Sequence, residues 1–595
     1  MPPKTSQART GISSFRHVLT RAGARRALGI DPRPSRARGG ERLAPLALAL
    51  GRVALLAGVV LAAAVFPAAL SSAAVSCPAV SSAAVSPALD PSANGETRPS
   101  QERRLSAREL RAARQDLEEL RADMRSRDAG DRRRALRKAA QIGGPDALAF
   151  VLDALGDERG QVADTAESML VEHFAESAAL ALQGPAGLAS KDPWRRVRAI
   201  ETLAELGVAP DAGPLAKALD RRDPRLAWTA LVAIERVAAL GPAAGWDEGA
   251  RKRLAKKVRP LLKRAAGDEL QARALLALDA LDPEAAQARR TDASSGPRQR
   301  AASLERILER REDGALRALA AAIGDGDPGL RAFALERVAS GHADRAVLSA
   351  VVARLEAEPR PCVRERAVRA LRAATGLGHG ANARAWGAAV DALPADWSPG
   401  PGARADDEDD GGSQGAVALG GLDPKSDRVA VLVDFSGSQW QIRKDGTRRK
   451  DALDPEVTAF LGRLSEDARF VVVPFTQELH PVTEGPVDAS RRAVERACAD
   501  FAACRHSGSG DAFRALEYVL DFGEIDRIVL VSDGAPSGGR RWEIGRIVDL
   551  LLERTRLRPV TFDVLVDGAS KGIVRRWRRL TDATGGRTIA VDAPR

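Results

Sequence analysis

Small oxygen-bearing side chains follow two apolar runs in the last third of the chain, and their types suit a hard divalent cation. Asp434, Ser436 and Ser438 come directly after the run RVAVLV, and Asp533 follows the run DRIVLVS. Magnesium takes six oxygen ligands at about 2.0–2.1 Å, and two carboxylates with two hydroxyls supply part of that shell. We therefore predict a cation site that leaves positions open to water or to an outside oxygen atom.

The elements that must position these side chains follow an alternating pattern. Segments of helical period separate short apolar runs that have the composition of buried strands, at residues 428–433, 470–475, 528–531 and 560–566. The alternation predicts a doubly wound α/β domain, a mostly parallel sheet with helices on both faces, in which ligands gather at the carboxyl ends of the strands. We expect the strands before Asp434 and Asp533 to be neighbours near the sheet centre.

Three segments of this region resemble, in the same order, those of von Willebrand factor A (VWA) domains. Asp434, Ser436 and Ser438 are similar to the first segment of the metal-ion-dependent adhesion site, and Ser532-Asp533-Gly534 to the segment whose aspartate completes the metal shell. DATGGRTIAV, at residues 582–591, resembles the final helix, glycine turn and last strand. The resemblance covers roughly residues 427–593. It implies a bound Mg²⁺, Mn²⁺ or Ca²⁺ that coordinates a carboxylate of a protein partner.

The middle loop departs from the family pattern. VWA domains place a threonine there, and that position falls on Gly510 in SGSGD, residues 507–511. A neighbour, Ser509 or Asp511, is expected to take its place, and we include Ser509 with Asp434, Ser436, Ser438 and Asp533 in the predicted metal set. Ser and Asp after a strand also cap helices, which is the alternative without a ligand.

Charge and cysteine content exclude other classes of function. The 595 residues have room for several domains, and the formal net charge is +11. Residues 1–52 hold eleven Lys and Arg against Asp31 and Glu41, a net of +9, so only +2 remains beyond them. Because that remainder lacks basic stripes with interleaved aromatic residues, we expect no nucleic-acid partner. The four cysteines are too scattered for a disulfide framework or a zinc site.

The N-terminal region predicts a membrane connection. The basic tail, residues 1–52, is followed by a transmembrane or signal segment at residues 53–74. Its stretch VALLAGVVLAAAVFPAAL carries no charge and, as a helix, is about 27 Å long, enough to cross a bilayer. Positive charge before this stretch predicts a cytoplasmic tail and a membrane-anchored or exported protein whose C-terminal domains lie outside the cytoplasm. Cleavage after the segment remains an open alternative.

The middle of the chain repeats. A low-complexity and charged helical spacer, residues 75–127, precedes repeats over residues 128–397. The motif Asp192-Pro193 recurs 31 residues later as Asp223-Pro224. Asp327-Pro328 recurs at the same interval as Glu358-Pro359. Each acidic residue is expected to cap a helix that begins with proline. The units resemble short, alanine-rich HEAT repeats of bacterial type, and such helical solenoids bind partners on a concave face.

The leading functional interpretation is a non-enzymatic, membrane-tethered interaction protein. An acidic Gly/Pro linker, residues 398–427, joins the repeats to the VWA-like domain, residues 428–595. One alternative is a metal-free scaffold whose site has decayed, which Gly510 favours. The other is an enzyme of the HEAT-like lyase or metal hydrolase type. The chain has no HExxH, P-loop or nucleophile elbow, and its repeats hold only the separated His173, His342 and His379.

Overall fold

The computed structural model describes residues 106–220, 222–241, 245–263, 267–290, 295–399, 419, 422–442 and 446–591. The predicted basic tail, the apolar segment 53–74 and most of the linker 398–427 lie outside these residues. None of the helices in the described part of the chain has both the length and the hydropathy that crossing a bilayer requires.

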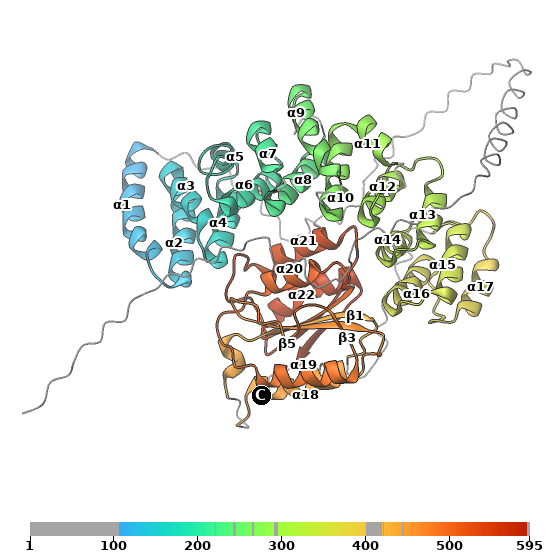
Figure 1. Ribbon diagram of the computed structural model, residues 1–595. Helices are drawn as coiled ribbons and strands as arrows, with labels where there is room; N and C mark the ends of the chain where they lie inside the picture. The colour runs from blue at the N-terminus through green and yellow to red at the C-terminus, as the bar shows by residue number, and fades with distance from the viewer. Residues whose placement is uncertain are drawn as a thin grey trace, which may run out of the picture. The chain divides into compact units, whose positions relative to one another are not determined.

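The first part of the described chain is a helical solenoid, in which successive helices pack side by side (Figure 1). One continuous core of small and aliphatic side chains runs through it, dominated by alanine and leucine. Its helices are α1 (Ala107–Met124), α2 (Ala129–Ile142), α3 (Gly144–Asp153), α4 (Gly160–His173), α5 (Ala175–Leu182), α6 (Pro193–Glu205), α7 (Ala212–Ala218), α8 (Pro224–Ala239), α9 (Glu248–Val258), α10 (Asp268–Leu281), α11 (Pro283–Arg290), α12 (Pro297–Glu309), α13 (Ala315–Ile323), α14 (Pro328–Ala339), α15 (Arg345–Ala357), α16 (Pro361–Thr375) and α17 (Ala383–Asp391).

Helix α1 falls in the segment that the sequence predicts as a spacer, and it packs against α2 and α3. Its residues Leu117 and Leu120 are buried in the solenoid core. Ser106 and Glu109 form a capping box at its start, which satisfies backbone N–H groups there. The helix therefore acts as the first layer of the solenoid.

Three of the four expected proline caps are confirmed, and one is wrong. The side chains of Asp192, Asp223 and Asp327 accept hydrogen bonds from backbone N–H groups of α6, α8 and α14. Helix α16 instead begins at Pro361 after Arg360, with no side-chain cap. Glu358 is buried and its carboxylate accepts hydrogen bonds from the Arg331 guanidinium, at 2.8 Å to each oxygen. The same carboxylate accepts from the Arg354 guanidinium and from the Arg360 backbone N–H, just before α16, at 2.9 Å, so guanidiniums rather than N–H groups inside the helix hold it.

The second part is an α/β domain with a six-stranded sheet in the order β3-β2-β1-β4-β5-β6. Its strands are β1 (Arg428–Asp434), β2 (Arg469–Phe475), β3 (Val487–Asp488), β4 (Arg527–Ser532), β5 (Thr561–Asp567) and β6 (Thr588–Val591). All pairings are parallel except that of β3 with β2. Strand β1 pairs with β4 at the centre, which confirms the expected adjacency of the strands that lead to Asp434 and Asp533.

Helices cover both faces of this sheet (Figure 1). Helices α20 (Ala512–Leu520), α21 (Ile544–Thr555) and α22 (Lys571–Thr584) bury one face, against Ala430 and Leu432 of β1. Helices α18 (Arg449–Leu461) and α19 (Arg491–Ala503) bury the other, against Val429 and Val431. Because alternate strand residues point to opposite faces, a continuous apolar strand such as β1 requires a layer on each side.

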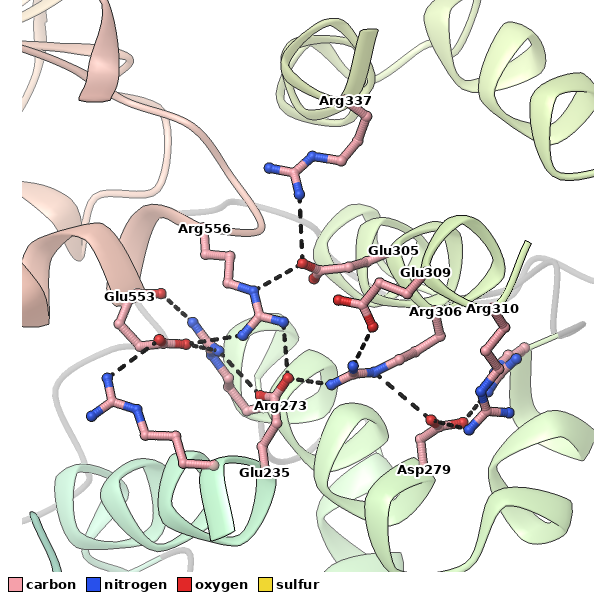
Figure 2. Close-up of polar contacts among 12 residues, drawn as sticks. Glu235, Arg273, Asp279, Glu305, Arg306, Glu309, Arg310, Arg337, Glu553 and Arg556 are labelled. Carbon is pink, nitrogen blue, oxygen red and sulfur yellow. Dashed lines mark hydrogen bonds and ion pairs between the residues drawn. The ribbon is translucent and has the colours of Figure 1, made fainter. Parts of the chain in front are cut away.

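A charged network joins the solenoid to the α/β domain (Figure 2). Arg556, just after α21, donates to Glu235 of α8 at 2.8 Å and to Glu305 of α12 at 2.9 Å. Glu553 of α21 accepts from Arg273 of α10. Leu557 of the α/β domain is buried in the solenoid core, so apolar packing accompanies the ion pairs. The solenoid face that bears these residues is thus occupied by another part of the same chain.

Candidate functional site

The candidate site lies at the carboxyl end of the two central strands. Strand β1 ends at Asp434, and Asp533 comes directly after the last residue of β4. The two strands are in register up to the pair Val433 and Val531. The residues that follow therefore leave the sheet at the same level, as the sequence predicts for a shared site.

Asp434 is a buried carboxylate with few neutralising partners. Only 2% of the residue is exposed. Its Oδ1 accepts from the Ser436 backbone N–H at 2.8 Å, and its Oδ2 accepts from the Ser532 hydroxyl at 3.1 Å. Burial, and then the charge of Asp533, raise the pKa of Asp434 to about 6. The pair of aspartates is thus a position where a positive charge is favoured.

The two serines after β1 lie together at the start of a short 3₁₀ turn, Gly437–Trp440. The hydroxyls of Ser436 and Ser438 are 2.9 Å apart. The backbone N–H of Gly437 donates to the carbonyl oxygen of Gly508 at 2.9 Å, which ties this turn to the middle loop, residues 507–511. The structure therefore places the hydroxyls of Ser436 and Ser438 together, next to Asp434.

The middle loop meets the site through Gly510, and its side chains turn elsewhere. A Cβ added to Gly510 would lie 2.6 Å and 2.9 Å from the carboxylate oxygens of Asp434, so no side chain fits there in this conformation. The Ser509 hydroxyl lies against Gly538, where an added Cβ would be 2.7 Å from it. Asp511 caps α20 by accepting from the backbone N–H of Arg514. Glycine at this position thus lets the loop backbone close on Asp434.

Ser532, Arg449 and Asp567 also belong to the site, although the sequence-based set omits them. The Arg449 guanidinium lies 3.9 Å from an Asp533 oxygen and 3.6 Å from an Asp567 oxygen. Asp567 ends β5, the strand next to β4, just as Asp434 ends β1. An aspartate at the end of a third apolar strand is a signal that the sequence offered. Arg449 carries no such signal, because it starts a helix and does not follow a strand.

The donor set fits a hard divalent cation. Two carboxylates, Asp434 and Asp533, and two hydroxyls, Ser436 and Ser438, offer only oxygen atoms, which Mg²⁺ and Ca²⁺ prefer. Within the part of the chain that the structure describes, no group of three or more His, Cys, Asp and Glu side chains is arranged to hold a metal. A softer metal that needs nitrogen or sulfur ligands therefore has no such group in this region.

A pair of histidines lies next to the middle loop, because the Thr476 hydroxyl, beside Gly508, is 3.0 Å from Nε2 of His480. His480 and His506 stack with ring centroids 3.6 Å apart, beside Asp500 and Cys504 in a shallow pocket of about 330 Å³. Cys362, Cys498 and Cys504 are free thiols. Burial raises the pKa of Cys362 to about 11, which keeps it protonated and unreactive.

Comparison with known proteins supplies no family. No family model matches the sequence, and no curated protein matches it. Solved structures that match include a human deoxyhypusine hydroxylase in complex with glycerol, with 21% sequence identity, 44% of this chain and 96% of that chain covered, and a TM-score of 0.19. Another is the Deinococcus radiodurans RO (RSR) protein, with 17% sequence identity and a TM-score of 0.19. The match covers 79% of this chain and 88% of that chain. At these TM-scores neither likeness defines a substrate or a partner for this chain.

Proposed function

We propose that this chain is a non-enzymatic interaction protein that binds an acidic group of a protein partner through a divalent cation at a VWA-type site. Asp434 and Asp533 hold the cation together with Ser436 and Ser438. Ser509, the neighbour expected to replace the family threonine, would have to turn away from Gly538 to join them. A bound Mg²⁺, Mn²⁺ or Ca²⁺ supplies an electrophilic position for an oxygen atom of the partner.

One observation carries this proposal: a buried carboxylate, Asp434, faces a second carboxylate at the carboxyl end of adjacent central strands. Two like charges at one site destabilise each other unless a cation lies with them. Four carboxylate and hydroxyl ligands from this chain leave coordination positions open, since Mg²⁺ takes six ligands. The open positions are where a partner's carboxylate would bind.

A peptide-binding measurement tests the proposal. We expect the full chain to bind a glutamate-containing peptide in Mg²⁺ and to lose that binding in EDTA. The matched peptide with glutamine in place of glutamate should bind at least about tenfold more weakly, because a neutral amide loses the charge-assisted contact to the cation. Equal binding of the two peptides, or binding that persists in EDTA, contradicts the proposal.

We also propose that the protein is membrane-anchored or exported, with the α/β domain outside the cytoplasm. The support is the charge of +9 before the apolar segment 53–74. A reporter enzyme fused after Arg595 is expected to be active outside the cytoplasm and inactive in a control that lacks residues 53–74. Cytoplasmic activity of the intact fusion contradicts this placement.

The metal-free scaffold is the second candidate, and Arg449 favours it. Its guanidinium already lies beside Asp533 and Asp567, so it supplies a positive charge at the site without a metal. Gly510, which stands where the family has threonine, removes one possible ligand. Absence of any cation effect on the wild-type chain favours this second candidate.

A further inference from the structure

The segment between β4 and α21, residues 533–543 and here called the β4–α21 loop, fixes the backbone of the candidate site. The Ser537 hydroxyl accepts from the Gly510 backbone N–H at 2.8 Å. In return, the backbone N–H groups of Ser537 and Gly538 donate to the Gly510 carbonyl oxygen at 3.2 Å and 3.0 Å. Gly510 lies against the Asp434 carboxylate. The position of the middle loop at the site thus depends on the β4–α21 loop.

The same loop is bound to the solenoid on its other side. The Gly160 backbone N–H, at the start of α4, donates to the Gly539 carbonyl oxygen at 2.8 Å, and the Gln161 side chain donates to the Ser537 carbonyl oxygen at 3.1 Å. A Cβ on Gly160 would lie 2.6 Å from the Arg540 carbonyl carbon, so the two backbones are in direct contact. Asp164 of α4 accepts from two further backbone N–H groups of the loop.

Arg541 anchors this contact. Only 1% of the residue is exposed, and its guanidinium lies among three solenoid carboxylates, Asp164, Glu167 and Glu201. Its distance to a Glu167 oxygen is 3.1 Å. Arg198 of α6 pairs with Asp164 at 2.7 Å and with Glu167 at 3.0 Å, so it shares these carboxylates. Removing Arg541 takes away the guanidinium that pairs with Glu201 and leaves Asp164 and Glu167 to Arg198 and Arg546, which favours separation of the loop from the solenoid.

We infer that Arg541 is a positioning residue for the candidate cation site, an inference that rests on the proposed function. Arg541 itself touches none of the predicted ligands. It holds the β4–α21 loop on α4 and α6, and that loop holds Gly510 and Ser509 in place. The solenoid therefore completes the site of the α/β domain. Contact of the β4–α21 loop with the solenoid raises the affinity for the cation, and cation binding stabilises that contact by the same factor.

Titration calorimetry with Mg²⁺ on the full chain tests the inference. We expect Arg541→Gln to weaken Mg²⁺ binding by about tenfold, a coupling in the usual range for linked sites. Arg541→Lys keeps the charge and should stay within about threefold of wild type. The matched control is Arg556→Gln, which removes a different interface guanidinium at the opposite end of α21 from the loop, and should change affinity less than about twofold. Wild-type affinity in Arg541→Gln, or equal losses in both Gln variants, overturns the inference.

A milder variant and a second readout keep the inference testable if Arg541→Gln does not fold. Gln161→Ala removes only the hydrogen bond to the Ser537 carbonyl oxygen and should weaken Mg²⁺ binding about twofold to threefold. Hydrogen exchange of the Gly510 amide, measured without metal, should quicken in Arg541→Gln and in Gln161→Ala and stay unchanged in Arg556→Gln. Unchanged exchange in the first two variants overturns the inference even if the wild-type chain binds no cation. Faster exchange in those two alone, with no cation binding by the wild type, supports the positioning role and refutes the proposed function.

Discussion

Millimolar Mg²⁺ is expected to raise the unfolding temperature of the α/β domain by about 5–10 °C. A ligand at about 100 times its dissociation constant stabilises the folded state by ~2.7 kcal/mol, and 1 kcal/mol shifts the midpoint of a domain of this size by about 2–4 °C. Asp434→Ala should abolish the shift, because it removes the buried carboxylate at the centre of the site. Calorimetric scans with Mg²⁺ and with EDTA measure both effects.

Two further variants separate loss of the ligand from loss of the fold. Asp434→Asn keeps the shape and removes a charge that is buried beside Asp533, so the metal-free domain should gain stability while the Mg²⁺ shift disappears. Arg449→Gln removes the guanidinium beside Asp533 and leaves the predicted ligands in place, so its Mg²⁺ shift should equal or exceed that of wild type. A full shift in Asp434→Asn would mean that the cation binds elsewhere.

The second large effect is expected at the contact between the solenoid and the α/β domain (Figure 2). Arg273 is buried on α10 and pairs with Glu553 of α21, and its guanidinium also lies 3.7 Å from Glu235. Arg273→Gln removes a positive charge that neutralises Glu553 and Glu235 where the two domains exclude water. We expect a loss of about 3–5 kcal/mol in the free energy of unfolding, the usual result of removing one partner of a buried pair. Urea unfolding of the full chain measures this loss.

The matched control is Arg579→Gln. Arg579 pairs with Asp549 on the surface, where both side chains are nearly half exposed, so the variant should lose less than about 1 kcal/mol. The double variant Arg273→Gln with Glu553→Gln removes both charges and should recover part of the loss. Equal losses for Arg273→Gln and Arg579→Gln would show that the buried network adds no stability.

The same network predicts how stability depends on acidity. Burial alone would raise the pKa of Glu553, but Arg273 and Arg556 outweigh it and lower that pKa to about 2. A carboxyl group whose pKa is lower in the folded than in the unfolded state stabilises the fold at pH values above the unfolded pKa of 4.5. This contribution, roughly 3 kcal/mol, is lost as the pH falls from 4.5 toward 2. In Glu553→Gln the loss over that pH window should be smaller.

The sequence by itself determined the elements and the placement of the two aspartates at the ends of adjacent strands. Apolar runs of strand length, alternating with helical period, are set by neighbours in the chain, and they predicted the parallel sheet with helices on both faces. Asp434 and Asp533 followed from that pattern because parallel strands end at one edge. The capping roles of Asp192, Asp223 and Asp327 were likewise local, since a cap bonds to a backbone two or three residues away.

Only the tertiary structure decided which distant charges meet. Glu358 carries the same local pattern as the three capping aspartates, yet the Arg331 guanidinium holds it because the fold brings that group within 2.8 Å. Arg449 reaches Asp533, and Arg541 reaches Glu167, across 84 and 374 residues of chain. No local rule selects among 91 Lys and Arg and 80 Asp and Glu. A charge pairs with whichever opposite charge the packed helices bury beside it, and this depends on the packing of the whole solenoid against the sheet domain.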